Sequence, residues 1–178
     1  MNNRPAGDCY QLRYRWTVEG PIDTIFTYVS DGRTFKDWFF VFKEVIPDDP
    51  DQGVEVGAHT RFKVKALLPY LLDWHVTVTN VDRPHLLETA VQVTLSGRFP
   101  MSGYIRYRFQ EEGGLVVVEN EQELCSERRL PGPLRRLAQA AFTLNHDWAM
   151  RRAEEPLRRV VRAAAERAAA ENPGQAAL

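Results

Sequence analysis

The sequence predicts an α+β fold in which a curved, seven-stranded antiparallel sheet is covered by one long C-terminal helix. Alternation of apolar and polar residues recurs between residues 10 and 126, with turn residues separating the runs. Two short helical patterns interrupt this alternation early in the chain, and a helical pattern covers residues 134–170. A long helix with an apolar stripe needs a surface to cover, and a twisted sheet supplies one.

Length and composition place the chain among single-domain globular proteins. It has 178 residues and a formal net charge of -1, which argues against a general nucleic-acid-binding protein. No apolar run is long enough for stable membrane insertion, and no signal-peptide core follows residues 1–4. We therefore expect a cytoplasmic protein with a loose N-terminus at 1–9, one domain at 10–170 and a tail at 171–178.

The two cysteines, Cys9 and Cys125, are too few and too far apart in the sequence to form a metal or redox motif. Reduced thiols are the expectation for a cytoplasmic protein, with a disulfide between the two residues as the alternative.

The first elements are a strand and two short helices. Residues 10–19 alternate apolar and polar side chains as a half-buried strand does. Gly20 and Pro21 turn the chain into a helix at residues 22–29, and Gly32 is expected to end it in a left-handed conformation. A second short helix at 34–40 gathers several aromatic residues, which form either core or one wall of a pocket.

The remaining strands have a period of two. They are expected at residues 42–46, 59–66, 70–78, 87–95, 105–109 and 115–126. Residues 97–103 are predicted to form a connection and residues 111–114 a hairpin turn. The strands at 59–66 and 70–78 should form a hairpin around Pro69.

The final helix follows Pro131, Gly132 and Pro133, which would end any preceding strand and allow a helix to begin. Its apolar stripe is predicted to consist of Leu134, Leu137, Ala138, Ala141, Leu144, Asn145, Trp148 and Arg152. Pro156 should bend or break the helix because it removes a backbone donor. Beyond it, a narrower stripe resumes at Leu157, Val160, Val161, Ala164 and Ala168.

This order of elements resembles the START/Bet v 1-like superfamily with the helix-grip fold, in particular its bacterial polyketide cyclase/dehydrase and lipid-transport (SRPBCC) group. The resemblance covers about residues 10–169 and is carried by residues 20–26, Trp38, residues 56–57, residues 82–84 and residues 145–152. It implies an apolar ligand enclosed between the sheet and the long helix.

Inward-facing positions supply the predicted ligand-binding residues, which combine many apolar groups with a few polar ones. They are Trp38, Phe62, Val64, Tyr70, Trp74, Val76, Val91, Tyr107, Asn120, Gln122, Ala141, Asn145 and Trp148. The alternative is structural: the buried amides bond to one another, and the aromatic residues are ordinary core.

The sequence contains no recognisable metal, cofactor or nucleophile motif, so no metal or cofactor is expected and catalytic residues cannot be assigned. The acidic loop at 48–53 fails the pattern of a calcium site. His75 alternates to the outer face of its strand unless a bulge reverses it. His146 and Asp147 are adjacent on a helix and do not face each other, so His146 is expected to lie on the surface.

Three functional hypotheses remain. The first is a carrier or sensor that binds a hydrophobic small molecule such as a lipid, isoprenoid or polyketide. The alternative is an enzyme resembling polyketide aromatase/cyclases, which needs a base in the cavity. The third is an interaction module that uses its arginine-rich helix, or a homodimer formed through Leu157, Val160, Val161 and Ala164.

Overall fold

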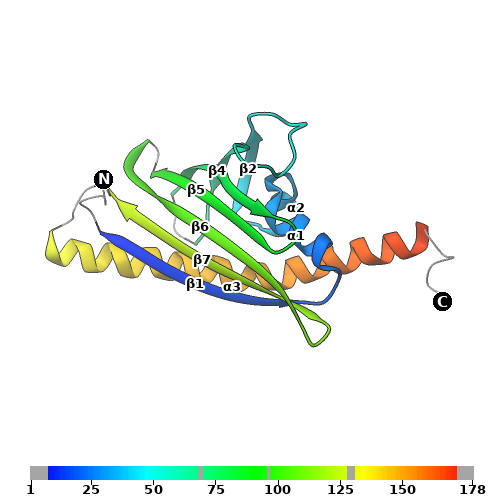
Figure 1. The fold of residues 1–178 in the computed structure, drawn as a ribbon. Helices are drawn as coiled ribbons and strands as arrows, with labels where there is room; N and C mark the ends of the chain where they lie inside the picture. The colour runs from blue at the N-terminus through cyan, green and yellow to red at the C-terminus, as the bar shows by residue number, and fades with distance from the viewer. Residues whose placement is uncertain (1–7, 68–69, 96, 128–130, 172–178) are drawn as a thin grey trace.

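The computed structural model describes residues 8–67, 70–95, 97–127 and 131–171 (Figure 1). The predicted loose end and tail therefore lie almost wholly outside the described residues. In chain order the elements are β1 (Cys9–Val18), α1 (Ile22–Ser30), a 3-10 helix η1 (Gly32–Thr34), α2 (Phe35–Trp38), β2 (Phe42–Pro47), β3 (His59–Val64), β4 (Leu72–Asp82), β5 (Leu86–Leu95), β6 (Arg98–Glu112), β7 (Leu115–Ser126) and α3 (Gly132–Glu171).

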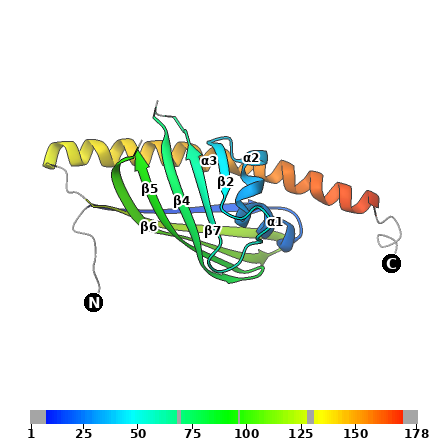
Figure 2. The same cartoon turned by 90° about the horizontal axis from the view of Figure 1, so that it is seen from above.

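The strands form one antiparallel sheet of seven, in the order β1-β7-β6-β5-β4-β3-β2. The sheet curls around α3, which runs across its concave face and extends past the strands at both ends (Figure 2). Helices α1 and α2 pack against α3. This architecture confirms the predicted helix-grip α+β fold. Among the described residues, no helix combines the length and the apolar composition that crossing a membrane requires.

The end of β6 that was predicted to be a connection, residues 97–103, is mostly strand. Glycine normally weakens a strand, but Gly103 lies so close to β7 that an added Cβ would overlap the carbonyl oxygen of Glu123. The β6–β7 turn is also shorter than predicted. Gly113 and Gly114 alone make it, with φ of 59° and 86°, while residues 111–112 still pair with β7.

The short helices differ from the prediction in their ends. Gly32 does not provide a left-handed cap, because α1 ends at Asp31 in an extended conformation. The Asp31 carboxylate instead accepts a hydrogen bond from the Arg33 N–H (3.0 Å) and caps η1. Helix α2 ends at Trp38, two residues earlier than expected. The hairpin expected around Pro69 is formed by β3 and β4, although residues 68–69 lie outside the described residues.

The C-terminal half of α3 is clamped to β1. The Thr17 N–H donates to Glu154 Oε1 (3.0 Å), and Arg158 Nε donates to the Thr17 carbonyl (2.8 Å). Glu154 and Arg158 also form an ion pair (2.7 Å). Because β1 is an edge strand, these side chains satisfy backbone groups that the sheet leaves unpaired. The helix is thereby fixed on the sheet at this end.

Two predictions about the last helix need correction. Pro156 does not break α3, which is continuous from Gly132 to Glu171, so the bend is the part of that prediction that stays open. The leucines at positions 134, 137 and 144 do not face the sheet, because they are 56%, 67% and 61% exposed. The first turns of α3 extend past the strands (Figure 2), whereas Leu144 lies next to Asn145, which lines the cavity, and is exposed because it occupies another side of the helix.

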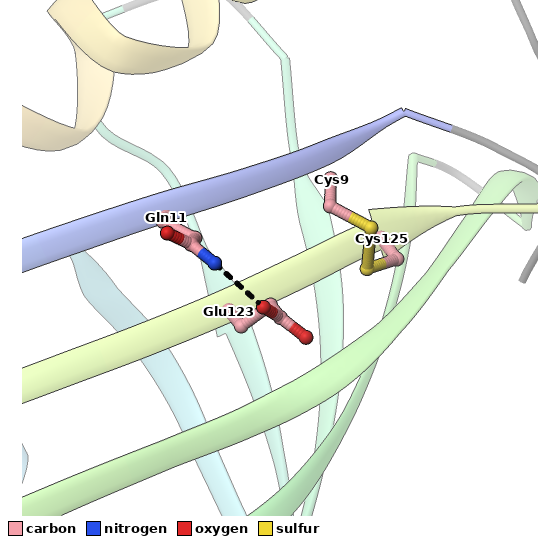
Figure 3. The surroundings of a disulfide bond; sticks show 4 residues. All are labelled: Cys9, Gln11, Glu123 and Cys125. Carbon is pink, nitrogen blue, oxygen red and sulfur yellow. Dashed lines mark hydrogen bonds between the residues drawn. A yellow bond between two sulfur atoms is a disulfide. The ribbon is translucent and has the colours of Figure 1, made fainter. Parts of the chain in front are cut away.

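The expectation of reduced thiols is also wrong. Cys9 and Cys125 are directly opposed in the β1–β7 ladder and form a disulfide bond (Figure 3). In the same ladder, Gln11 Nε2 donates to Glu123 Oε2 (2.9 Å). Disulfides are uncommon in reducing compartments, so the bond does not support the predicted cytoplasmic location, which stays a prediction.

We predict that Cys9→Ser lowers the free energy of unfolding by about 2–4 kcal/mol, because the bond closes a loop across 116 residues of the chain. Urea unfolding monitored by tryptophan fluorescence measures this difference. A reductant should destabilise the wild-type protein to the same extent and leave the variant unchanged. Equal stability of the oxidised and reduced wild-type protein would contradict the prediction.

Candidate ligand cavity

A cavity of about 130 Å³ lies between α3 and the concave face of the sheet. An engineered apolar cavity of ~150 Å³ in another protein binds benzene, so this space is large enough for a guest of about one ring. It exceeds the small voids that ordinary core packing leaves.

The cavity wall has three parts. The sheet contributes mainly apolar side chains, and α3 contributes about two turns of its buried face. The rim comes from the segment around η1 and the loop before β3. The principal lining residues are Phe62, Val64, Trp74, Val76, Val78, Leu87, Thr89, Ile105, Tyr107 and Gln122 from the sheet and Phe142, Asn145, His146, Ala149 and Met150 from α3.

The structure brings about half of the predicted ligand-binding residues to this wall. Those that line it are Phe62, Val64, Trp74, Val76, Tyr107, Gln122 and Asn145. Those that do not are Trp38, Tyr70, Val91, Asn120, Ala141 and Trp148. Whether the lining residues contact a ligand stays a prediction.

The residues that miss the wall do so for identifiable reasons. Trp38 packs edge-on against Trp16 (5.9 Å between ring centroids) and is part of the core. Trp148 lies outside the cavity, against Phe40 (5.3 Å) and beneath the guanidinium of Arg152 (4.8 Å). Trp148 misses the cavity because the buried face of α3 is rotated relative to the predicted stripe.

Sequence reasoning missed most of the α3 wall, namely Phe142, His146, Ala149 and Met150. A signal was present in the sequence, because Asn145, Ala149, Ala153, Leu157 and Val161 repeat every four residues and are all buried. The predicted stripe missed this face because it was based on the leucines near the start of α3, which are exposed.

Unpaired polar atoms occur in the cavity wall and directly behind it. Gln122 Nε2 donates to Asn120 Oδ1 (2.6 Å), as the structural alternative predicted. This bond leaves Asn120 Nδ2 and Gln122 Oε1 without partners in the described part of the chain, and Trp74 Nε1 is likewise unpaired. The two amides are 1% and 3% exposed, so water does not readily satisfy them. Each such atom costs about 1–3 kcal/mol, which a guest with a polar group could recover.

A second cluster of polar side chains lies between β1 and α3, where Tyr14 of β1 contacts the adjacent residues His146 and Asp147 of α3. The Tyr14 hydroxyl donates to Asp147 Oδ1 (2.6 Å) and lies 3.2 Å from His146 Nδ1. The rings of Tyr14 and His146 stack (5.5 Å between centroids). His146 is therefore not the surface residue that was expected. Although it does not face Asp147 directly, Tyr14 bridges the two side chains.

Burial governs the acid-base properties of this group. It lowers the pKa of His146 to about 4, and the charge of Asp147 opposes that shift. Burial also raises the pKa of Tyr14 well above its usual value, with the hydrogen bond to Asp147 acting in the same direction. Burial alone raises the pKa of Tyr107. The cavity wall therefore carries a neutral imidazole at His146 and a neutral phenol at Tyr107 at pH 7.

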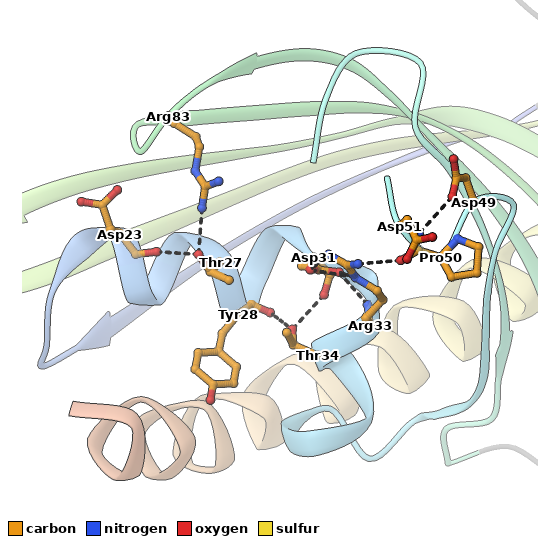
Figure 4. Close-up of polar contacts among 10 residues, drawn as sticks. All are labelled: Asp23, Thr27, Tyr28, Asp31, Arg33, Thr34, Asp49, Pro50, Asp51 and Arg83. Atoms are coloured by element: carbon orange, nitrogen blue, oxygen red, sulfur yellow. Dashed lines mark hydrogen bonds and ion pairs between the residues drawn. The ribbon is translucent and has the colours of Figure 1, made fainter. Parts of the chain in front are cut away.

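The rim is held by Arg33 (Figure 4). Its guanidinium pairs with Asp31 (2.6 Å) and donates to the Pro50 carbonyl (2.7 Å), which joins η1 to the acidic loop. Within the loop, the Asp51 N–H donates to Asp49 Oδ1 (2.9 Å). No group of three potential metal-binding side chains occurs among the residues that the structure describes.

No protein-family model and no curated protein matches the chain, whereas solved structures do. A protein from Rhizobium leguminosarum matches with a TM-score of 0.63 and 16% identity, over 86% of this chain and 97% of that one. Ara h 8.0201 matches with a TM-score of 0.58 and 8% identity, over 88% of this chain and 99% of that one. DynU16, from the dynemicin biosynthetic locus, matches with a TM-score of 0.52 and 16% identity, over 85% of this chain and 47% of that one.

Identities this low show a shared fold alone. The neighbours therefore support the fold of the chain. The resemblance to the START/Bet v 1-like superfamily, and to its polyketide cyclase and lipid-transport group, stays a prediction.

We predict that His146 titrates near pH 4 in the folded protein, because burial disfavours its charged form. The unfolded chain, with a histidine pKa of about 6.5, then binds more protons than the folded chain between the two values. The His146 contribution to stability is therefore complete above about pH 6.5 and decreases as the pH falls toward 4.

An NMR titration of the His146 imidazole measures the folded value, and His146→Gln identifies the resonance by removing it. Denaturation at several pH values should show a smaller loss of stability on acidification in that variant. Titration of His146 near pH 6.5 would contradict the assignment.

Proposed function

We propose that the protein binds a small hydrophobic molecule carrying a polar group in the cavity between the sheet and α3, as a carrier or sensor. The observation that supports this proposal is an apolar cavity of about 130 Å³ bordered by the unpaired Trp74 Nε1 and Gln122 Oε1. A wholly apolar guest would leave both atoms unsatisfied. A guest with a hydroxyl or carbonyl group could pair with one of them.

The size of the cavity constrains the guest. About 130 Å³ accommodates one ring, whereas a lipid, isoprenoid or polyketide chain is larger. For these classes the rim must open, and the hydrogen bond from Arg33 to the Pro50 carbonyl, which joins η1 to the acidic loop, is the contact that opening would break. This contact is an exposed polar interaction, which costs little to exchange for water.

The enzyme alternative is favoured by one specific observation. An aromatase/cyclase-like reaction needs a base in the cavity wall, and His146 occupies such a position. The helix-surface hypothesis is weaker, because Leu157 and Val161 are fully buried against the domain. They are not available to form the homodimer contact that the sequence suggested.

We predict that phenol binds more tightly than toluene, which has the same number of non-hydrogen atoms but no hydrogen-bonding group. For guests of this size a Kd of about 0.1–1 mM is expected for phenol. Titration followed by NMR should move the indole N–H resonance of Trp74, and the phenol–toluene difference measures the contribution of the unpaired polar atoms.

Two matched variants control this experiment. Ala149→Phe fills the cavity from α3 and should abolish binding, whereas Ala90→Phe adds the same side chain at an exposed position of β5 and should not. If Ala149→Phe does not fold, Val76→Phe fills the cavity from β4. Saturable binding that survives cavity filling, or no saturation by either probe, would refute the proposal.

A further inference from the structure

Helix α3 has a second apolar face, which its own sheet does not cover. The face that includes Asn145 and Ala149 is buried against the domain. Leu137 and Leu144 project from a different side of the helix and are 67% and 61% exposed. In Figure 2 this part of α3, drawn in yellow, runs along the outside of the molecule. Exposed apolar residues that gather on one face indicate a contact with another molecule.

The exposed apolar residues repeat at the spacing of a helix-pairing surface. The residues on this side of the helix, called the α3 patch below, are Leu134, Leu137, Ala140, Ala141, Leu144 and Trp148. Three and four residues alternate between positions 134, 137, 141, 144 and 148, which is the repeat of a coiled-coil seam. Such a narrow stripe suits a second helix better than a sheet. The surface therefore predicts a helix as its partner.

The α3 patch is complementary to an inverted copy of itself. Ala141 lies midway between Leu134 and Trp148, and within one residue of the midpoint between Leu137 and Leu144. A second α3 that crosses antiparallel at Ala141 therefore brings Leu134 against Trp148 and Leu137 against Leu144. A two-fold axis repeats each of these contacts. Alanine at the crossing point lets the two helix axes approach closely.

Charged residues beside the α3 patch select the antiparallel arrangement. Arg136 and Asp147 line one shallow hollow on the surface of α3, about 16 Å apart along the helix axis. Their midpoint also lies within one residue of Ala141, so an antiparallel pair places Arg136 of each copy against Asp147 of the other. A parallel pair would instead oppose like charges. Arg151 lies opposite positions before Gly132, where the second helix has not begun.

We propose that the protein forms a homodimer in which the α3 patches of two copies pack antiparallel about a two-fold axis near Ala141. This contact differs from the one that the sequence suggested, which used Leu157 and Val161. It does not depend on a guest in the cavity, because the patch and the cavity lie on different sides of α3. Two helices in contact over about 22 Å bury less than the roughly 1,200 Å² of stable complexes, so we expect a reversible dimer with a Kd of about 10–100 µM.

Sedimentation equilibrium of the full-length protein over about 1–500 µM should show a monomer–dimer equilibrium with this Kd. Leu137→Gln combined with Leu144→Gln should raise the Kd at least about tenfold, because residues at the centre of an interface contribute most to binding. Glutamine has nearly the helix propensity of leucine, so α3 is retained. Leu115→Gln makes the same change at another exposed leucine (39%), beside the β6–β7 turn, and should leave the Kd unchanged. That turn lies far from the start of α3 (Figure 1).

Two further measurements test the charges and the orientation. Arg136→Glu opposes Asp147 of the second copy with a like charge and should raise the Kd at least about threefold, whereas Arg162→Glu, at an exposed position of α3 outside the patch, should not.

Because the native cysteines are joined in a disulfide, one added cysteine reports on orientation. Ala140→Cys should crosslink two copies under mild oxidation, since it lies beside the two-fold axis. Leu134→Cys should not, because antiparallel pairing holds its two copies about 20 Å apart.

Each contrary outcome overturns the proposal at a different point. A protein that stays monomeric over the whole range does not form the dimer, whatever else binds the α3 patch. A dimer that survives both leucine changes forms through another surface. Efficient crosslinking through Leu134→Cys rules out the antiparallel arrangement. Should the double leucine variant not fold, Arg136→Glu decides, because it alters an exposed side chain: an unchanged Kd then refutes the proposed contact.

Discussion

The attachment of α3 to the edge strand β1 is the constraint on which the rest of the structure depends. Glu154 and Arg158 satisfy the backbone of Thr17, and Trp16 Nε1 donates to the Met150 carbonyl (3.1 Å) one turn earlier. These bonds fix the distance between the helix and the sheet at one end. Because a helix is stiff and the sheet curls, the two surfaces cannot remain in contact along their full length. The cavity is the space that this mismatch leaves.

Met150 connects the clamp to the cavity. Its carbonyl accepts the Trp16 hydrogen bond, while the residue also belongs to the cavity wall. Towards the C-terminus, Ala153, Leu157 and Val161 are completely buried, and Val161 packs so closely on Gly20 that a Cβ there would lie 2.6 Å from it. Good packing at one end and empty space at the other indicate that the cavity is not a general packing fault. Consistent local packing with unpaired polar atoms at one place is typical of functional sites.

The sequence was sufficient to predict the fold because alternation and turn residues define strands locally, and their order limits the topology. It misplaced the start of β6, since Gly103 is required by the close approach of Glu123, a contact that residue patterns do not reveal. The face of α3 was also misassigned, because a helical stripe does not show where the sheet beneath it ends. The disulfide and the contact between Tyr14 and His146 join residues more than 100 positions apart. Local periodicity contains no information about such pairs.

Binding and proton transfer place opposite physical demands on the cavity. Removal of water favours an apolar guest, but it also disfavours the charged form of His146 and lowers its pKa to about 4. The buried imidazole is therefore a weaker proton acceptor than a histidine in water. Tyr14 and Asp147 hold the ring in place whether or not a guest can react. The same burial that makes the cavity suitable for an apolar guest thus favours the binding proposal over the enzyme alternative.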